Sequence, residues 1–587
     1  MKIEDLSKQE LLDLVKAYES KKKYGLVWEE EKSREHFEFD NNKILPILSE
    51  LKTSRIKSAE KAETNYLIEG DNYYALNILK YTHAGAIDFI YIDPPYNTGN
   101  KDFKYNDVFI DQEDSFRHSK WLTFMNKRLK IARELLSDDG VIFISIGEDE
   151  YAQLKLLCDS IFGEKNYLTN FGWEKTQHFG RQKVNFYSNL DYVLCYAKQL
   201  HSTVAGENRK KELLVERIKE EHEDAPLYNA SNRINSLEFP KGSVLFNMPD
   251  GSYSKTTDNK YELLSNVTVK DSKNKEILKL RFKSRWSQSK IDEELAKGTT
   301  FWVKTETFAI RAIYGSGKTS RDSSKQILFS NTSNKAATYS RFGVKVGTNE
   351  EGSSELAQIL GEQDVFNYPK PRTLIEYFIS LYFDYRKSEH KKSFTILDFF
   401  AGSGTTGHAV LSLNKYDSGE RNFIMVTNNE DKICDEVTYP RLKKVMKGYK
   451  DSSNIKVDGL GGNLNYFRIK FINRSLNSDE MKIRINENCI DLLCFREGIF
   501  DEEHSTSDSY KIYKNGDKVL GIYNSFDYGD LPKLKNDLDK YEEMIKKVYV
   551  FTFDNSGLNP NDFLDWKNVE LEPIPQKILE IIGELYA

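Results

Sequence analysis

Residues 394–410 read FTILDFFAGSGTTGHAV, and this stretch decides how the chain folds. The run from Phe394 to Leu397 is short and apolar, which is typical of a buried strand. The residues from Asp398 to Gly404 predict a tight glycine turn, and Thr405 begins a predicted helix. Glycines let a backbone approach a ligand closely, and the first N–H groups of a helix have no partner within it. The stretch therefore predicts a nucleotide-type binding cradle.

A second strand and turn lie far upstream, at residues 87–100, which read IDFIYIDPPYNTGN. The apolar strand ends at Asp93, which together with a backbone carbonyl can accept both hydrogens of a planar exocyclic amine. Tyr96 can stack on the ring that carries this amine. Pro95 has no N–H donor, so the carbonyl of Pro94 is held facing outward in a stiff turn. Asp-Pro-Pro also ends strands in ordinary loops, and that interpretation stays open for the motif taken alone.

Together the two motifs resemble those of the DNA amino-methyltransferases that use S-adenosylmethionine. The catalytic D-P-P-Y motif precedes the cofactor motif D-x-F-x-G-S-G-T-T by roughly 300 residues, about the size of one or two domains. This order resembles the beta class of DNA adenine methyltransferases, in which a target-recognition domain is inserted between the motifs. Shorter strings are similar to the modification (Mod) subunits of type III restriction–modification systems: LIEGDN (67–72), YND (105–107), RHSKWL (117–122), TNNE (427–430), VTYPR (437–441), YFR (466–468) and PIP (573–575).

The resemblance implies an α/β fold, namely a Rossmann-like S-adenosylmethionine-dependent methyltransferase with an inserted target-recognition domain and a small α/β C-terminal domain. The expected segments are an N-terminal helical segment (1–60), the catalytic half of the core (61–200), the inserted domain (201–360), the cofactor half (361–452) and a C-terminal domain for subunit contacts (453–587).

The hydrophobic pattern independently favours a parallel sheet with helices on both faces, because short apolar runs alternate with helical stretches. Strands are predicted at 65–69, 87–92, 141–146, 191–197, 394–397 and 422–427, and helices at 71–81, 117–136 and 149–162. Helices are also predicted over 1–40 and 45–62. The C-terminal region predicts a hairpin over 510–520 with an Asn-Gly turn, a charged helix (532–547), a strand (548–553) and an apolar helix (576–585).

The resemblance also assigns site residues. It implies that Asp93, Pro94, Pro95 and Tyr96 are catalytic, and that the cofactor contacts Asp71, Phe366, Pro369, Lys370, Asp398, Phe400, Gly402, Gly404 and Thr405. For Asp71 a helix N-cap is an equally good reading and does not exclude the first, and Lys370 can alternatively be a plain surface lysine. Glu430 is the one carboxylate near the expected ribose position, and its role stays open. His118 is expected to be structural.

Residues from about 200 to 360 are rich in Lys, Arg, Ser, Asn and Gly with interleaved aromatic residues, which suits phosphate neutralisation with base stacking or groove contacts. A solvated basic surface is the alternative for any single residue. The predicted DNA-binding residues are Lys283, Arg285, Arg311, Lys318 and Arg321. The string GSGKT at 315–319 imitates a P-loop, but Ala312 stands where the leading glycine belongs, so we interpret it as a basic loop.

The bulk composition limits the class of protein. With 587 residues, the chain is too long for one core, and about three or four domains are expected. No apolar run is long enough to span a membrane and no signal peptide is evident, so a cytoplasmic protein is expected. The five cysteines show no C-x-x-C pairing and no metal-ligand cluster is evident. The net charge of −6 neither supports nor excludes DNA binding, because DNA senses a local basic face.

The expected function is site-specific transfer of methyl from S-adenosylmethionine to N6 of a flipped adenine. The expected partners are double-stranded DNA, a second copy of the chain in a homodimer, and a separate ATP-dependent restriction (Res) subunit. Four alternatives stay open: a solitary DNA adenine methyltransferase, a cytosine-N4 methyltransferase, an RNA or protein amide methyltransferase, and a non-catalytic DNA-recognition subunit. Asp rather than Ser before Pro-Pro-Tyr favours adenine over cytosine.

Overall fold

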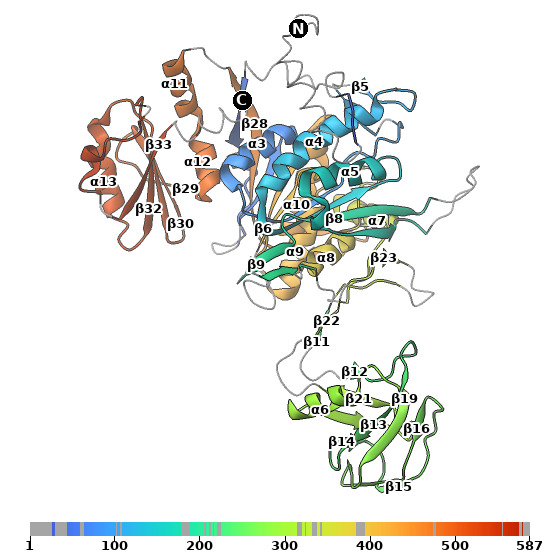
Figure 1. The fold of residues 1–587 in the computed structure, drawn as a ribbon. Coiled ribbons are helices and arrows are strands. Elements are labelled where there is room, and N and C mark those ends of the chain that lie inside the picture. Colours follow the sequence, from blue (N-terminus) through green and yellow to red (C-terminus); the bar gives the residue numbers. More distant parts are fainter. Residues whose placement is uncertain are drawn as a thin grey trace, which may run out of the picture. The chain divides into compact units, whose positions relative to one another are not determined.

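Figure 1 shows the protein as a computed structural model, in which the chain forms two compact units. Unit 1 comprises Met1–Leu214 and Lys325–Ala587, and unit 2 comprises Val215–Ser324. The structure describes residues 26–578 apart from 30–43, 59–63, 101, 106–107, 178–187, 205–206, 211–212, 215–216, 220–224, 314–319, 323, 331–336, 341–342, 383–393, 474–476, 555, 567 and 575–577.

A ten-stranded sheet forms the centre of unit 1. In spatial order its strands are β1 (Ile44–Glu50), β28 (Asn463–Asn473), β2 (Thr64–Glu69), β25 (Asn422–Thr427), β24 (Thr395–Asp398), β3 (Ile87–Ile92), β6 (Leu136–Ile146), β8 (Leu190–Ala197), β7 (Tyr167–Glu174) and β23 (Ile327–Leu328). All pairs from β28 to β6 are parallel, whereas β8 runs antiparallel to both of its neighbours. The sheet is thus mixed, with the predicted parallel part at its centre.

Helices cover both faces of this sheet (Figure 1), as the hydrophobic pattern predicts. Successive side chains of a strand point to opposite faces. In β3, accordingly, Ile90 and Ile92 enter one core and Phe89 and Tyr91 the other. The first core contains residues of α3 (Asn72–His83), α4 (Arg117–Leu135) and α5 (Tyr151–Phe162). The second contains residues of α7 (Asn349–Leu360), α8 (Arg372–Leu381), α9 (Thr405–Asp417) and α10 (Tyr439–Lys447). The predicted α/β fold is confirmed.

The predicted helix at 45–62 is wrong. Its first part is β1, which pairs antiparallel with β28, and only Lys52–Ser54 form a short 3-10 turn. Pro46 cannot donate to a central ladder, so the edge of the sheet suits it. The partner strand lies about 400 residues away in the sequence, so no local signal marks the pairing. The predicted helix over 1–40 lies almost wholly outside the described residues.

Unit 2 is built mainly of strands around its own apolar core. A seven-stranded sheet contains, in order, β12 (Ala225–Pro226), β21 (Ile310–Ile313), β20 (Thr300–Val303), β14 (Val244–Phe246), β18 (Lys273–Asn274), β17 (Val267–Lys270) and β15 (Gly251–Tyr253). A second sheet contains β13 (Ile234–Phe239), β19 (Leu278–Lys283) and β16 (Tyr261–Leu263), and α6 spans Gln288–Ala296. A separate pair joins β11 (Arg217–Lys219) to β22 (Ser320–Asp322).

Unit 2 is narrower than the inserted domain expected over 201–360. Residues from Lys325 onward belong to unit 1, where β23 extends the main sheet beside β7 and α7 contributes to its second core. At the other end, β28 lies within the main sheet beside β2, although the expected C-terminal domain begins at 453. Unit 1 also contains three small two-stranded ladders: β4 (Lys104–Tyr105) with β5 (Val108–Phe109), β9 (His201–Val204) with β10 (Glu207–Lys210), and β26 (Gly448–Lys450) with β27 (Lys456–Asp458).

The C-terminal part of unit 1 adds a five-stranded sheet in sequence order: β29 (Asp501–Glu503), β30 (Tyr510–Asn515), β31 (Lys518–Tyr523), β32 (Ile545–Phe551) and β33 (Val569–Ile574). The predicted hairpin is confirmed as β30–β31, but its two-residue turn is Gly516–Asp517, because Asn515 still pairs with Lys518 at the end of the strand. The helix predicted over 532–547 is shorter, because α13 (Leu531–Asp539) ends early and β32 begins before the expected position. The apolar helix predicted over 576–585 lies almost wholly outside the described residues.

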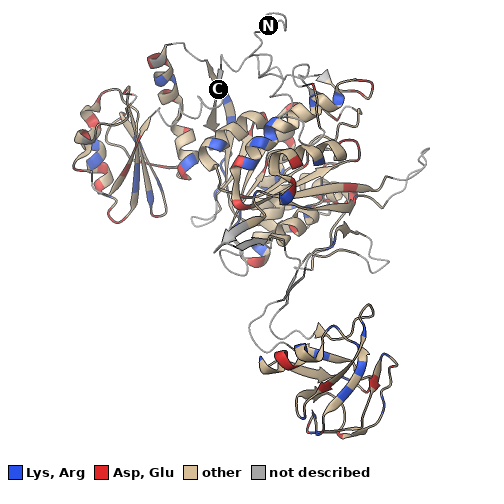
Figure 2. Ribbon diagram, viewed as in Figure 1, with Lys and Arg blue, Asp and Glu red and all other residues tan. Residues whose placement is uncertain are grey.

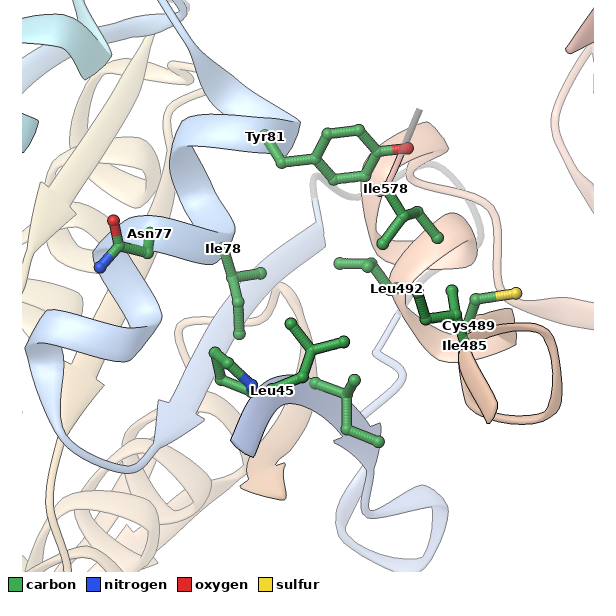
Figure 3. A pocket seen from close by; sticks show the side chains of 10 residues that line it. Leu45, Asn77, Ile78, Tyr81, Ile485, Cys489, Leu492 and Ile578 are labelled. Carbon is green, nitrogen blue, oxygen red and sulfur yellow. The ribbon is translucent and has the colours of Figure 1, made fainter. Parts of the chain in front are cut away.

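Two helices, α11 (Ser478–Asn488) and α12 (Ile490–Glu497), connect this sheet to the main one. Where they meet β1 and α3 they leave an almost wholly apolar pocket (Figure 3). Its lining is Leu45, Pro46, Ile47, Asn77, Ile78, Tyr81, Ile485, Cys489, Leu492 and Ile578. This pocket contains no residue of the two sequence motifs, so it is not the candidate active site.

Candidate active site

The carboxyl ends of β24 and β3 lie side by side at the centre of the main sheet. Leu397 pairs with Ile90 in parallel register, so Asp398 and Asp93 follow at the same edge. The chain leaves β24 through α9 towards β25, whereas it leaves β3 through α4 towards β6 on the opposite side. Open α/β sheets bind ligands at the point where the crossovers diverge in this way. The fold therefore brings the two distant motifs to one binding position.

The carboxylate of Asp93 is partly exposed, and its two oxygens differ. Oδ2 accepts a hydrogen bond from Nζ of Lys370 at 2.8 Å, and the Lys370 side chain is only 8% exposed. Oδ1 is buried and has no hydrogen-bond partner. Buried carboxylate oxygens are normally satisfied. The carboxylate is therefore held by Lys370 at one oxygen, and its other oxygen lacks a donor among the described residues.

The ring of Tyr96 is held on three sides. Its hydroxyl donates to Oδ2 of Asp191 at 3.3 Å, and Nζ of Lys370 lies 5.1 Å from its centroid. On another side a Cβ added at Gly147 would come within 2.7 Å of the ring. Burial, followed by the carboxylates of Asp191 and Asp93, raises the pKa of Tyr96 well above its usual value. The phenol therefore stays protonated and donates to Asp191.

Asp191 is itself buried at the start of β8, where Oδ1 accepts a hydrogen bond from Nζ of Lys175 at 2.7 Å. A buried carboxylate needs a paired charge or several donors. Lys175 supplies that charge, and the phenol of Tyr96 supplies a second donor. The pair therefore anchors the aromatic ring from its far end.

The next residue, Asn97, fixes the end of the motif. It has a positive φ of 57°, a conformation that Asn tolerates better than most residues. Its side-chain amide donates to Oε1 of Glu150 and to the backbone carbonyl of Arg117. His118 contacts the same Glu150 oxygen at 2.7 Å, which agrees with its expected structural role. Burial raises the pKa of Glu150 to about 8, so this carboxyl is largely protonated at neutral pH.

The two proline carbonyls have different surroundings. The indole Nε1 of Trp121 on α4 donates to the carbonyl of Pro95 at 2.8 Å. This bond ties the turn to the helix behind it and occupies the second carbonyl of the motif. Of the two proline carbonyls, that of Pro94 is therefore the one that we expect to accept a hydrogen bond from an amine.

The glycine turn after β24 has the backbone that the sequence predicts. Gly402 and Gly404 have φ values of 47° and 79°, in the left-handed region that favours glycine. Asp398 shapes the turn from beneath, because its carboxylate accepts the N–H of Phe400 at 3.0 Å and the hydroxyl of Thr406. Burial raises the pKa of Asp398 to about 7 in spite of these two donors. Its oxygens serve the turn itself, so Asp398 supports the cradle from below.

Arg441 on α10 supports the same turn from behind. Its side chain is fully buried and donates to the carbonyl and hydroxyl of Ser403 and to the hydroxyl of Thr405 at 2.8 Å. It also pairs with Glu355 of α7 at 3.2 Å. The hydroxyl of Thr405 therefore faces Arg441, and the residue can meet a ligand only through its backbone at the start of α9.

Phe366 and Lys370 approach the motifs from the segment that precedes α8. A Cβ added at Gly402 would lie 3.3 Å from the Phe366 ring, so this ring covers the glycine turn. Pro369 is buried against α7, since a Cβ at Gly352 would meet its carbonyl at 2.4 Å. The side chain of Lys370 extends to Asp93, as described above. This segment thus joins the cradle to the D-P-P-Y motif.

Asp71 follows β2, the strand beyond β25, and caps α3 by accepting the N–H of Tyr73 at 2.7 Å. The N-cap reading of this residue is therefore confirmed, and about half of its side-chain surface remains exposed. Arg128 of α4 approaches the same carboxylate at 3.4 Å. The neighbouring Asn72 donates to the carbonyl of Phe399, which links α3 to the cradle.

Glu430 lies at the start of a short turn after β25 and is about half exposed. Its carboxylate pairs with Nζ of Lys104 at 3.4 Å, in the β4–β5 hairpin that follows the D-P-P-Y motif. An exposed pair of this kind stabilises little by itself. It does place the hairpin beside the end of β25.

The predicted DNA-binding residues all fall within unit 2. Figure 2 marks the Lys and Arg positions on its strands. Arg285 is exposed, and Lys283 at the end of β19 donates to the carbonyl of Ala230 at 3.0 Å. Arg311 on β21 is half-buried. Arg321 lies on β22, and the P-loop-like string with Lys318 is outside the described residues.

Some features are absent from the described part of the chain. There, no three or more His, Cys, Asp or Glu side chains gather as they would around a metal ion. None of the described helices has the length and apolar composition needed for a membrane crossing. All five cysteines are buried and unpaired.

Sequence reasoning did not find Asp191, Lys175, Glu150 and Asn97. Two of them carry a signal in retrospect: Asp191 is an acid within an otherwise apolar strand, and Asn97 directly follows the motif. Lys175 and Glu150 carry no such signal in the sequence. Each acts through a partner, Asp191 and Asn97 respectively, that lies near it only in the folded protein.

A family profile and three similar proteins bear on this site. A sequence profile of the family described as DNA methylase matches residues 87–439, which is more than half of the chain. The chain is 32% identical to the type III restriction-modification enzyme StyLTI Mod subunit of Salmonella typhimurium, over 62% of this chain and 53% of that protein. It is 31% identical to the EcoPI Mod subunit of Escherichia phage P1, over 72% of this chain and 66% of that protein. It is 28% identical to the type II methyltransferase M.KpnI of Klebsiella pneumoniae, over 67% of this chain and 85% of that protein.

The profile begins at β3 and ends at the start of α10, so it includes the D-P-P-Y turn, the glycine cradle and all of unit 2. The chain spans between half and two thirds of the length of the two Mod subunits that it matches. The matched region contains both motifs in the order found here. This chain belongs to the DNA methylase family.

Proposed function

We propose that this chain is a site-specific DNA methyltransferase that acts on N6 of adenine and uses S-adenosylmethionine. The observation that carries the proposal is the convergence of Asp93 and the glycine cradle at adjacent strand ends. Membership of the DNA methylase family and similarity to two Mod subunits support it. Asp rather than Ser before Pro-Pro-Tyr favours adenine over cytosine.

The cradle fits the cofactor. The positive φ angles of Gly402 and Gly404 keep side chains away from the inner face of the turn, and the N-terminus of α9 follows at once. Phe366 covers the turn, and the carboxylate of Asp71 lies exposed beyond it. S-adenosylmethionine, when bound, supplies the methyl group on a sulfonium sulfur. Asp398, Ser403 and Thr405 hold the shape of the turn, and Gly402 and Gly404 line it.

Asp93 and the carbonyl of Pro94 prepare the amine. The N6 lone pair of adenine is delocalised into the ring, so the nitrogen is a poor nucleophile. Acceptance of both N–H bonds favours a tetrahedral nitrogen and frees the lone pair for in-line attack. The cofactor would supply the methyl carbon, with the electron pair of the broken S–C bond left on sulfur. The proton that the nitrogen loses would leave along its hydrogen bond to Asp93. This is placement and electrostatics, with no covalent enzyme intermediate.

Tyr96 provides the platform for the base. N6 is not accessible to such a pocket within a duplex, so the adenine must leave the stack and rest against an aromatic ring. The contacts with Asp191, Lys370 and Gly147 fix that ring before the base arrives. Unit 2, with Arg285 exposed, is the proposed surface for target recognition.

We further propose that the chain serves as the modification and recognition subunit of a type III system, as a homodimer with a separate ATP-dependent restriction subunit. The two Mod relatives support this assembly. A solitary methyltransferase is the second candidate, because the match to M.KpnI covers 85% of that type II enzyme. Co-expression with a neighbouring helicase–nuclease gene, followed by co-purification, separates the two candidates. A stable complex supports the type III assembly, and a methyltransferase that purifies alone supports the solitary enzyme.

The test is to incubate unmethylated genomic DNA with the purified protein and S-adenosylmethionine, and to map modified bases by long-read sequencing. We expect N6-methyladenine at one short sequence. Asp93→Ala should lower the rate by at least about 100- to 1,000-fold, because it removes an acceptor aimed at the reacting nitrogen, while DNA binding persists. Methylation of cytosine, or full activity in the Asp93→Ala variant, would contradict the proposal.

A further inference from the structure

Lys370 connects the two halves of the proposed active site. It stands between Pro369 and Pro371, directly before α8, in a segment that belongs to the cofactor half of the sequence. Its ammonium nevertheless reaches the catalytic half, where Nζ lies 2.8 Å from Oδ2 of Asp93. With 8% exposure, it is a buried cation in a fixed contact. A surface lysine, which the sequence left open, would have neither property.

The charges around Asp93 make this contact unusual. Asp398 on the neighbouring strand interacts unfavourably with it, and Asp191 lies at the far end of the Tyr96 ring. The buried phenols of Tyr91 and Tyr96 are neutral, and Lys175 is committed to Asp191. Among the residues that the structure describes, Lys370 makes the one ion pair of Asp93.

The contact fixes the carboxylate by one oxygen, because Oδ2 accepts a hydrogen bond from the buried ammonium of Lys370. Oδ1 is buried and has no hydrogen-bond partner among the described residues. A charge-assisted hydrogen bond of this kind is strong, so it sets the orientation of the carboxylate that the amine must meet.

We propose that Lys370 is a positioning residue for methyl transfer: it holds the carboxylate of Asp93 in the orientation in which it accepts the amine. This inference rests on the proposed function of the same site. It differs from the assignment of Lys370 to the cofactor, because it makes Lys370 act through Asp93 and predicts an effect on the chemical step.

A structural role is the competing explanation, since the ion pair also joins the segment before α8 to the D-P-P-Y turn. The two explanations differ in which kinetic constant changes. Loss of a clamp also loosens the segment that places Phe366 over the glycine turn, so KM for S-adenosylmethionine rises as kcat falls. Loss of the group that orients Asp93 lowers kcat and leaves that KM nearly unchanged.

The experiment compares wild type with Lys370→Met, Lys370→Gln and Lys370→Arg, with Lys155→Met as the matched control. Lys155 pairs with Asp159 at 2.7 Å on α5 and is partly buried, yet it touches neither motif. DNA carrying the mapped site is methylated by each variant, and kcat, KM for DNA and KM for S-adenosylmethionine are determined. Thermal unfolding of each variant reports whether it is folded, and Lys370→Gln replaces Lys370→Met if the latter is not.

We expect the neutral variants to lose about 10- to 100-fold in kcat, the range found when a partner that orients a functional group is removed. KM for S-adenosylmethionine should change by less than about threefold, since the effect is on a catalytic group rather than on uniform binding. Lys370→Arg should recover much of the loss, because it keeps a cation that can reach Asp93, and Lys155→Met should behave as wild type.

An unchanged kcat in the neutral variants would overturn the inference. A rise in KM for S-adenosylmethionine at constant kcat would overturn it in favour of cofactor binding. A fall in kcat with a matching rise in that KM, not recovered by Lys370→Arg, would overturn it in favour of a clamp. In each of these cases the wild type still methylates adenine, so the proposed function stands. A wild type that methylates no adenine removes the function, and this inference with it.

Discussion

Gly147 follows β6 and lies against the ring of Tyr96, so Gly147→Ala tests whether the position of that ring governs methyl transfer. A Cβ at this position would lie 2.7 Å from Cδ2 of Tyr96 and 3.4 Å from Cε2 and Cγ. Carbon atoms in contact normally lie about 3.5–4.0 Å apart, so the ring must retreat by roughly 1 Å. The hydrogen bond to Asp191 and the ammonium of Lys370 restrict that movement.

The added methyl group affects both the stability of the protein and its rate of methyl transfer. Overpacking of a buried site by one methyl group costs about 1–3 kcal/mol of stability. A displacement of about 1 Å at a group that positions the substrate lowers the rate by about 100-fold. The loss of rate should therefore be much larger than the small population of unfolded enzyme can explain, because a multidomain protein with several kcal/mol of stability remains folded after such a change.

The assay measures kcat and KM for DNA with the mapped site, together with the thermal unfolding of the same preparation. Gly529→Ala in the C-terminal domain is the matched control, since the atoms nearest to its Cβ would belong to the side chain of Asp527, the first of them at 3.2 Å. We expect Gly147→Ala to lose about 100-fold in kcat/KM, while the control is unchanged. A Gly147→Ala enzyme within about twofold of wild type would refute the argument that Tyr96 must stand where it does.

Two further changes probe the surroundings of the motif. Tyr96→Phe keeps the stacking ring but removes the hydroxyl that donates to Asp191. We expect it to lose up to about tenfold in kcat/KM, because such a hydrogen bond is worth about 0.5–1.5 kcal/mol. Tyr96→Ala removes the ring and should lose far more activity; equal losses in the two variants would argue against stacking. Glu150→Gln tests the buried carboxyl, whose pKa burial raises to about 8. Between the unfolded and folded pKa values the folded form holds a proton that the unfolded chain has lost, so wild-type stability falls as pH rises from about 4.5 to about 8. Urea unfolding at a series of pH values should show a smaller fall for Glu150→Gln. Identical pH profiles for wild type and variant would contradict the raised pKa.

The local parts of the fold were predictable, because their signals lie within a few residues of one another. The strands at 87–92 and 422–427 are buried apolar runs that end at turn residues, and the helix from Thr405 follows the glycines that permit the turn. β1 was not predictable in this way. Its pairing with β28 depends on a strand at the other end of the chain, and its apolar residues fit either a helix face or an edge strand.

The site shows the same division between local and distant signals. Asp93, Tyr96 and Gly402 stand out because their motifs are contiguous. Lys175 acts through Asp191, and Lys370 acts on a residue 277 positions away in the sequence. Such partners are selected by geometry after folding, so a sequence pattern around Lys370 alone predicts a location near the cradle and not its contact with Asp93.

The geometry of the site does not depend on which of the two motifs comes first along the chain. For the same reason a large insertion between the motifs leaves the site intact. Each motif strand begins its own crossover unit, β24–α9–β25 and β3–α4–β6, and each unit needs only the strand beside which it packs. The binding position is defined by the divergence of the two units, whichever comes first along the chain. Additional residues between the units, including all of unit 2, therefore leave the adjacency of Asp93 and Asp398 intact. Under the proposed function, target recognition can then vary in the inserted unit without any change in the groups that prepare the amine.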